Sequence, residues 1–126
     1  MAGLSDNVLR AALRAAAMAL ILSLQAMPEL RGVHVAIIGG LAVQHYVGNR
    51  RRTSDVDVLL FSPDYSIDTR RIRKELVSRF SHLFMECADP LFFKYRHGDS
   101  THLVQVDLIP QYLVCFGAAV RQTRLN

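Results

Sequence analysis

Residues 33–61 read VHVAIIGGLAVQHYVGNRRRTSDVDVLLF, and this stretch decides the fold. Its two apolar runs, residues 33–38 and 55–61, have the length and the β-branched content of buried strands. Gly39 and Gly40 end the first run, because glycine interrupts regular structure and permits a tight turn. The stretch therefore predicts a strand, a glycine turn and a second strand, with residues 41–47 suited to a short helix between them.

The rest of the chain adds two more helices and two more strands. The first helix starts at one of the capping residues 5–7 and ends before Pro28, and the other covers residues 66–80. The strands are expected at 91–96 and 102–109, joined by a hairpin loop, while residues 111–120 fit either a helix or an edge strand. Because the order is α-β-α-β-α-β-β, we expect an α/β (α+β) fold, with a mixed β-sheet flanked by helices in one domain over residues 1–126.

Three aspartates interrupt these apolar strands. Asp55 and Asp57 lie two residues apart, so alternation places both side chains on one face of a strand, while Asp107 lies in the later segment LVQVDLI. A carboxylate in a buried strand is costly unless it is paired or binds a cation. If the strand with Asp107 is a neighbour of the strand with Asp55 and Asp57, the three form an acidic cluster suited to a divalent metal. Pairing with nearby arginines is the alternative.

The whole pattern resembles the polymerase-β-like nucleotidyltransferase superfamily, and most closely its small AbiEii-like and minimal members. That superfamily has a Gly-Gly or Gly-Ser turn, then an acid-x-acid pair on the next strand and a third acid on a later strand. The small members share a spaced run of Gly, Arg and Thr before the acid pair. The matching residues here are Gly39 and Gly40, the run Gly48, Arg51 and Thr53, the pair Asp55 and Asp57, and Asp107.

The resemblance implies an enzyme that transfers a nucleotidyl group from a nucleoside triphosphate, ATP among the candidates, to a hydroxyl-type acceptor and releases pyrophosphate. It implies Mg²⁺ (or Mn²⁺) held by the three acids, with Asp107 nearest the acceptor hydroxyl. Gly39 and Gly40 would let the backbone approach the phosphates, although a plain strand-to-helix turn is an alternative reading. Arg51 is the arginine expected at the triphosphate. Thr53 and Ser54 are expected either to hydrogen-bond phosphate or to cap the start of the strand.

Two other readings compete with this one. Residues 35–40, VAIIGG, have the start of a dinucleotide-binding turn, but Leu41 stands where its second glycine is needed. Alternatively, the chain is a non-catalytic or repurposed descendant of the nucleotidyltransferase fold that acts as a binding or partner module. Family members often carry an acceptor-binding region after the third acid, and here residues 108–126 follow it. The acceptor is therefore unknown from the sequence, and a homodimer built through residues 113–120 is one way to complete its site.

Charge and cysteine content add weaker expectations. The net charge is +4, with basic clusters at residues 50–52 and 70–74, which could meet nucleotide or nucleic acid or be solvated surface. No aromatic-rich RNA-binding signature accompanies them, so sequence-specific recognition of nucleic acid is unsupported, while nucleic acid stays a possible partner. Cys87 and Cys115 lie outside any metal or C-x-x-C spacing and indicate free thiols of a cytoplasmic protein. The apolar run 15–22 is too short for a membrane span, and a domain helix is favoured there over a targeting segment.

Overall fold

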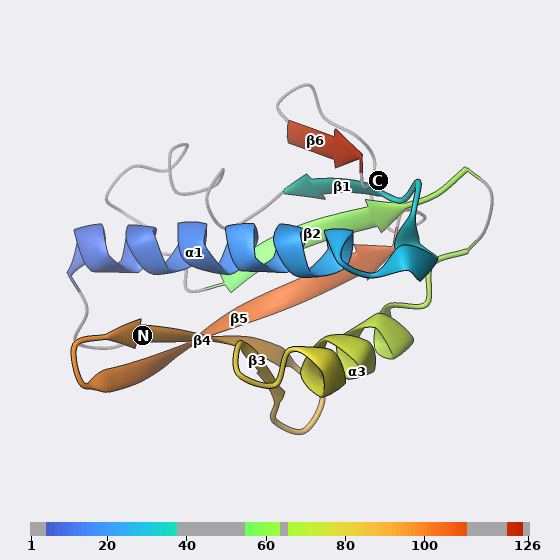
Figure 1. The fold of residues 1–126 in the computed structure, drawn as a ribbon. Helices are drawn as coiled ribbons and strands as arrows, with labels where there is room; N and C mark the ends of the chain where they lie inside the picture. The colour runs from blue at the N-terminus through green and yellow to red at the C-terminus, as the bar shows by residue number, and fades with distance from the viewer. Residues whose placement is uncertain (1–4, 38–54, 64–65, 111–120, 125–126) are drawn as a thin grey trace.

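The computed structural model describes residues 5–37, 55–63, 66–110 and 121–124. They form a six-stranded sheet in the order β3-β4-β5-β2-β1-β6, and the long helix α1 and the shorter α3 pack on it (Figure 1). In chain order the elements are α1 (Asp6–Gln25), the 3₁₀ turn η1 (Pro28–Leu30), β1 (His34–Ile37), β2 (Asp55–Phe61), α3 (Thr69–Arg79), β3 (Phe84–Glu86), β4 (Leu91–His97), β5 (Ser100–Pro110) and β6 (Arg121–Arg124).

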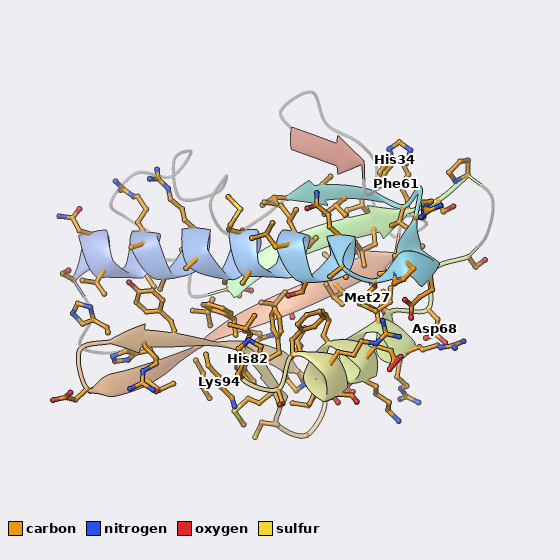
Figure 2. All side chains as sticks on the ribbon, viewed as in Figure 1. Met27, His34, Phe61, Asp68, His82 and Lys94 are labelled. Atoms are coloured by element: carbon orange, nitrogen blue, oxygen red, sulfur yellow. The ribbon has the colours of Figure 1, made fainter. Side chains whose placement is uncertain are left out.

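The sheet is mixed, as predicted. β2 and β5 run parallel, while the β1–β2, β1–β6, β3–β4 and β4–β5 pairs are antiparallel. In the β1–β2 register His34 lies opposite Phe61, and the two rings stack with centroids 4.7 Å apart (Figure 2). The antiparallel β1–β2 pair also removes the dinucleotide-binding reading, because a Rossmann unit needs these two strands parallel.

Helix α1 begins where the capping residues predict. The Ser5 hydroxyl accepts a hydrogen bond from the backbone N–H of Val8 at 3.3 Å, which satisfies one of the free donors of the first turn. Residues 7–25 are long and apolar enough to cross a membrane by length and composition alone. One face of the helix, however, packs in the core against the sheet, and its buried residues recur at helical spacing: Leu9, Ala12, Leu13, Ala16, Ala17, Leu20 and Leu24.

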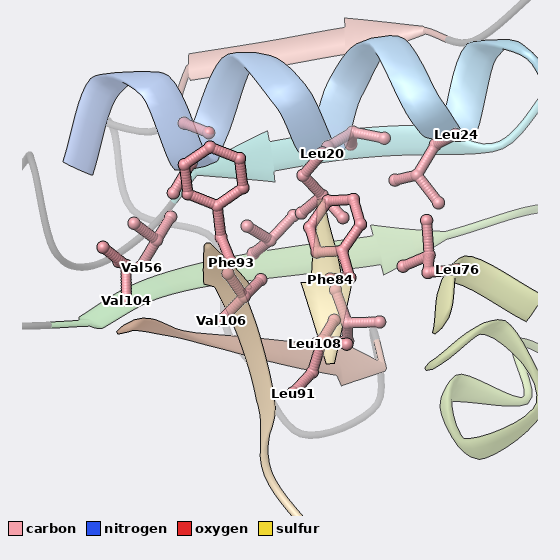
Figure 3. Packing of buried hydrophobic residues seen from close by; sticks show 14 of the residues in the cluster. Leu20, Leu24, Val56, Leu76, Phe84, Leu91, Phe93, Val104, Val106 and Leu108 are labelled. Carbon is pink, nitrogen blue, oxygen red and sulfur yellow. The ribbon is translucent and has the colours of Figure 1, made fainter. Parts of the chain in front are cut away.

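The core lies between the helices and one face of the sheet. Phe84, Phe93, Leu20 and Leu76 meet there, from β3, β4, α1 and α3 respectively (Figure 3). Val56, Val58, Val104, Val106 and Leu108 supply the valine-rich floor from β2 and β5. Because side chains alternate along a strand, the residues between these valines point to the opposite face of the sheet.

Several predicted boundaries need correction. Helix α3 starts at Thr69 rather than residue 66, because the carboxylate of Asp68 caps it by accepting from the backbone N–H of Arg71 at 3.2 Å. The strands β3 and β6 were not predicted: β3 has three residues, and β6, with the sequence RQTR, has no apolar alternation. The predicted segments at 41–47 and 111–120 lie outside the described residues.

The β4–β5 hairpin is tighter than predicted. His97 pairs with Ser100, so only Gly98 and Asp99 form the loop, and Gly98 has φ +62°. A positive φ at the first loop residue belongs to a type II′ turn, which favours glycine there.

We expect Gly98→Ala to lower the free energy of unfolding by about 1 kcal/mol through backbone strain alone, since a Cβ would meet no atom within 4 Å. Urea unfolding of the variant tests this, and an unchanged midpoint would contradict it.

Candidate functional site

The parallel register of β2 and β5 brings the three aspartates together. Asp57 lies directly opposite Asp107, and Asp55 lies opposite Gln105. Their neighbours Val56, Val58 and Val106 are buried in the core, so the carboxylates project from the other face of the sheet. One oxygen from each carboxylate lies within 4.8 Å of the others, and all three residues are half-buried. The predicted convergence of Asp107 with the acid pair is therefore present.

Partial burial and the neighbouring carboxylates together raise the pKa of Asp57. The pKa of Asp57 is raised from 3.8 to about 6, first by partial burial, then by a hydrogen bond with Asp107 and by the charges of Asp55 and Asp107. Among the described residues, no arginine or lysine contributes to this shift. The alternative prediction, that arginines neutralise the acids, therefore finds no support at Asp57 in the described part of the chain.

Gln105 belongs to the same cluster, although it was not among the residues predicted for the site. Its side-chain Nε2 donates a hydrogen bond to Oδ1 of Asp107 at 2.9 Å. The spacing in the sequence indicates this neighbour, because Gln105 precedes Asp107 by two residues and so lies on the same face of the strand.

The donor set fits a hard divalent cation. Carboxylate oxygens are the ligands that Mg²⁺ and Mn²⁺ prefer, and three of them within 4.8 Å can converge on one or two ions. The pKa of Asp57 is raised first by burial, and the charges of Asp55 and Asp107 that add to the shift would also attract such a cation. The residues that could hold the metal are thus the three predicted: Asp55, Asp57 and Asp107.

A polar cavity of about 170 Å³ lies beside Asp107 and Gln105, at the edge of β5 where β4 begins. Its outer wall includes Arg73 of α3, whose guanidinium lies 3.6 Å from Glu86 and 3.3 Å from Asp89. A second cavity of about 220 Å³, between η1 and the start of α3, contains none of the three aspartates. Of these two cavities, only the first adjoins the acidic cluster.

The residues predicted at the phosphates lie outside the described part of the chain. These are Gly39, Gly40, Arg51, Thr53 and Ser54, and their place at the site stays a prediction. The same holds for the predicted dimer surface at 113–120 and for Cys115, whereas Cys87 is an exposed free thiol.

The fold that carries this acidic cluster was compared with those of known proteins. No protein-family model and no curated protein sequence matches the chain. Among solved structures, an antigenic nucleotidyltransferase-like protein from Paracoccidioides brasiliensis matches 87% of the chain with a TM-score of 0.60 and 22% sequence identity. The chain has a nucleotidyltransferase-like fold. It spans 50% of the length of that solved structure.

The nucleotidyltransferase-like fold agrees with the resemblance inferred from the sequence. The predicted mixed sheet flanked by helices is confirmed, with the acid pair on β2 and the third acid on its neighbour β5. At 22% identity the likeness concerns the fold alone, because one fold can host many different chemistries.

Proposed function

We propose that this nucleotidyltransferase-like protein transfers a nucleoside monophosphate group from a nucleoside triphosphate to a hydroxyl-type acceptor, with release of pyrophosphate. The observation that carries the proposal is the convergence of Asp55, Asp57 and Asp107 within 4.8 Å on one face of the sheet. Neither the pair Asp55 and Asp57 nor Asp107 alone would indicate this chemistry, because a carboxylate in a strand often has a purely structural partner.

Each acid has a distinct position in the proposed reaction. Asp55 and Asp57, on one strand, would hold the metal ions against the triphosphate, and Asp107, on the neighbouring strand, would hold the metal nearest the acceptor. The bound Mg²⁺ would supply Lewis-acid stabilisation of the charge that develops on the phosphate oxygens. Asp107 also borders the 170 Å³ cavity, so an acceptor hydroxyl seated there would lie beside the carboxylate that assists its deprotonation.

The remaining contacts are proposed from the sequence pattern. Gly39 and Gly40 would let the backbone approach the triphosphate, and Arg51 would pair with its oxygens, assisted by Thr53 and Ser54. The acceptor is a partner of unknown identity.

Radiolabelled triphosphates test the proposal directly. Wild-type protein with Mg²⁺ or Mn²⁺ and each of the four ribonucleoside triphosphates, in the presence of a host extract as the acceptor source, should release pyrophosphate and transfer the labelled α-phosphate. The double variant Asp55→Asn, Asp57→Asn should do neither. Because the activity requires the metal, EDTA should abolish it as well.

The outcome separates the enzyme from the binding module. A wild-type protein that gains thermal stability from Mg²⁺ and triphosphate but releases no pyrophosphate would be the non-catalytic descendant. If neither ligand changes its melting temperature, the nucleotide-binding premise fails along with the enzymatic one.

A further inference from the structure

We propose that Gln105 is a positioning residue for the metal site, one that fixes the carboxylate of Asp107 through a neutral hydrogen bond. This inference rests on the proposed function. Its basis is the 2.9 Å hydrogen bond from Gln105 Nε2 to Asp107 Oδ1, which links the acidic cluster to an uncharged side chain.

The sheet holds Gln105 where this role requires. In the β2–β5 register it lies opposite Asp55, and in the β4–β5 register it lies opposite Phe92. Paired strands on both sides fix its backbone, and alternation places its side chain on the same face as Asp107. The amide is part-buried, so water competes weakly for its donor.

The hydrogen bond leaves the carboxylate of Asp107 with a defined orientation. A free aspartate rotates about χ2 with little preference, whereas a carboxylate with one oxygen held by an N–H presents its other oxygen in a fixed direction. Asp107 faces the cluster, since one of its carboxylate oxygens lies within 4.8 Å of an oxygen of Asp55 and of Asp57. Ligating carboxylates commonly have such outer partners, which raise metal affinity by reducing the disorder of the free site.

The side chain of Gln105 is uncharged, and this favours cation binding at the neighbouring carboxylates. A lysine or arginine could donate the same hydrogen bond, but its positive charge would offset the negative potential that attracts a divalent cation. An amide organises the site without reducing that potential. Residue 105 thus combines a donor, a suitable length and no charge.

Metal binding measures this role independently of turnover. We expect Gln105→Met, which keeps side-chain length and removes the donor, to weaken the affinity for Mn²⁺ by about 10- to 100-fold in a titration followed by the electron paramagnetic resonance of free Mn²⁺. The matched control is Leu103→Met, at an exposed position two residues earlier on the same face of β5, which should bind Mn²⁺ as wild type does. Both variants should melt close to wild type without metal, because neither position belongs to the core.

A second measurement uses the wild-type fold only. In ¹⁵N-labelled protein, the side-chain amide resonance of Gln105 should shift when Mg²⁺ is added, while that of Gln25, which is exposed on α1, should not. Equal Mn²⁺ affinity of Gln105→Met and wild type, or an unmoved Gln105 amide, would overturn the positioning role while leaving nucleotidyl transfer intact. A wild type that binds no Mn²⁺ and releases no pyrophosphate would instead overturn the proposed function, and the positioning role with it.

Discussion

Replacing Asp57 with asparagine should stabilise the metal-free protein at neutral pH and, in the same molecule, abolish its response to Mg²⁺. The first effect follows from the partial burial of Asp57 and from its crowding with Asp55 and Asp107, which together raise its pKa to about 6. At pH 7 the wild-type residue is ionised against this repulsion, whereas asparagine is neutral and nearly isosteric. Because Asp57 is only partly buried, solvent screens much of the repulsion, and we expect a gain of about 1 kcal/mol in the free energy of unfolding.

The pH dependence gives the sign of this effect. The pKa of Asp57 is higher in the folded protein than its ordinary value of 3.8, so the folded state binds the proton more tightly than the unfolded state does. The stabilisation that the folded protein gains from protonating Asp57 is fully present below pH 3.8, and it is lost as the pH rises through about 6. Thermal melts of metal-free protein should therefore show the advantage of Asp57→Asn growing between these pH values and constant above them.

Addition of Mg²⁺ should reverse the order of stability. Wild type gains stability in proportion to the logarithm of the metal concentration above its dissociation constant, whereas the variant lacks a ligand and gains little. The proposed nucleotidyl transfer should fall on the order of 1,000-fold, since losing a proposed metal ligand would remove several kcal/mol of transition-state stabilisation. Asp99→Asn makes the same chemical change in the exposed hairpin loop and should leave melting, metal response and transfer unchanged. A lower melting temperature for metal-free Asp57→Asn at pH 7 would contradict the account of the cluster.

The convergence of the three aspartates could be predicted because it depends only on side-chain alternation and on strand pairing. Alternation fixes Asp55 and Asp57 on one face, and the apolar segment around Asp107 requires a neighbouring strand to pair with. The strand bounds of β2 were predicted at residues 55–61 and agree with the structure, because strong turn residues follow them. In the same way, the capping serine located the start of α1.

Other features depend on tertiary context that local patterns do not contain. β6 has polar residues only, and it is a strand because β1 offers it an edge to pair with. The raised pKa of Asp57 depends on Asp107, which is 50 residues away in the sequence, so only the register of β2 with β5 reveals it. The hydrogen bond of Gln105 likewise depends on a side-chain orientation that spacing permits but does not require.

Strand β3 was not predicted from the sequence, yet we expect it to be among the most important elements for stability. It has three residues, yet its first, Phe84, is 1% exposed and is among the largest fully buried side chains of the described residues. The ring packs edge-on against Phe93 with centroids 5.9 Å apart, at the position where β3 and β4 pair (Figure 3). Aromatic pairs of this geometry add stability beyond the area they bury.

We therefore expect Phe84→Ala to lower the free energy of unfolding by about 3–5 kcal/mol, because it removes a buried ring and leaves a cavity between α1, α3 and the sheet. That is a large share of the about 5–15 kcal/mol that typical domains have, so the variant should melt at least about 10 °C lower. Met85→Ala, at the next position of the same strand and only half-buried, is the matched control and should cost clearly less. Urea unfolding of both variants measures the difference. Equal losses at the two positions would show that β3 contributes as an edge strand rather than through the ring it places in the core.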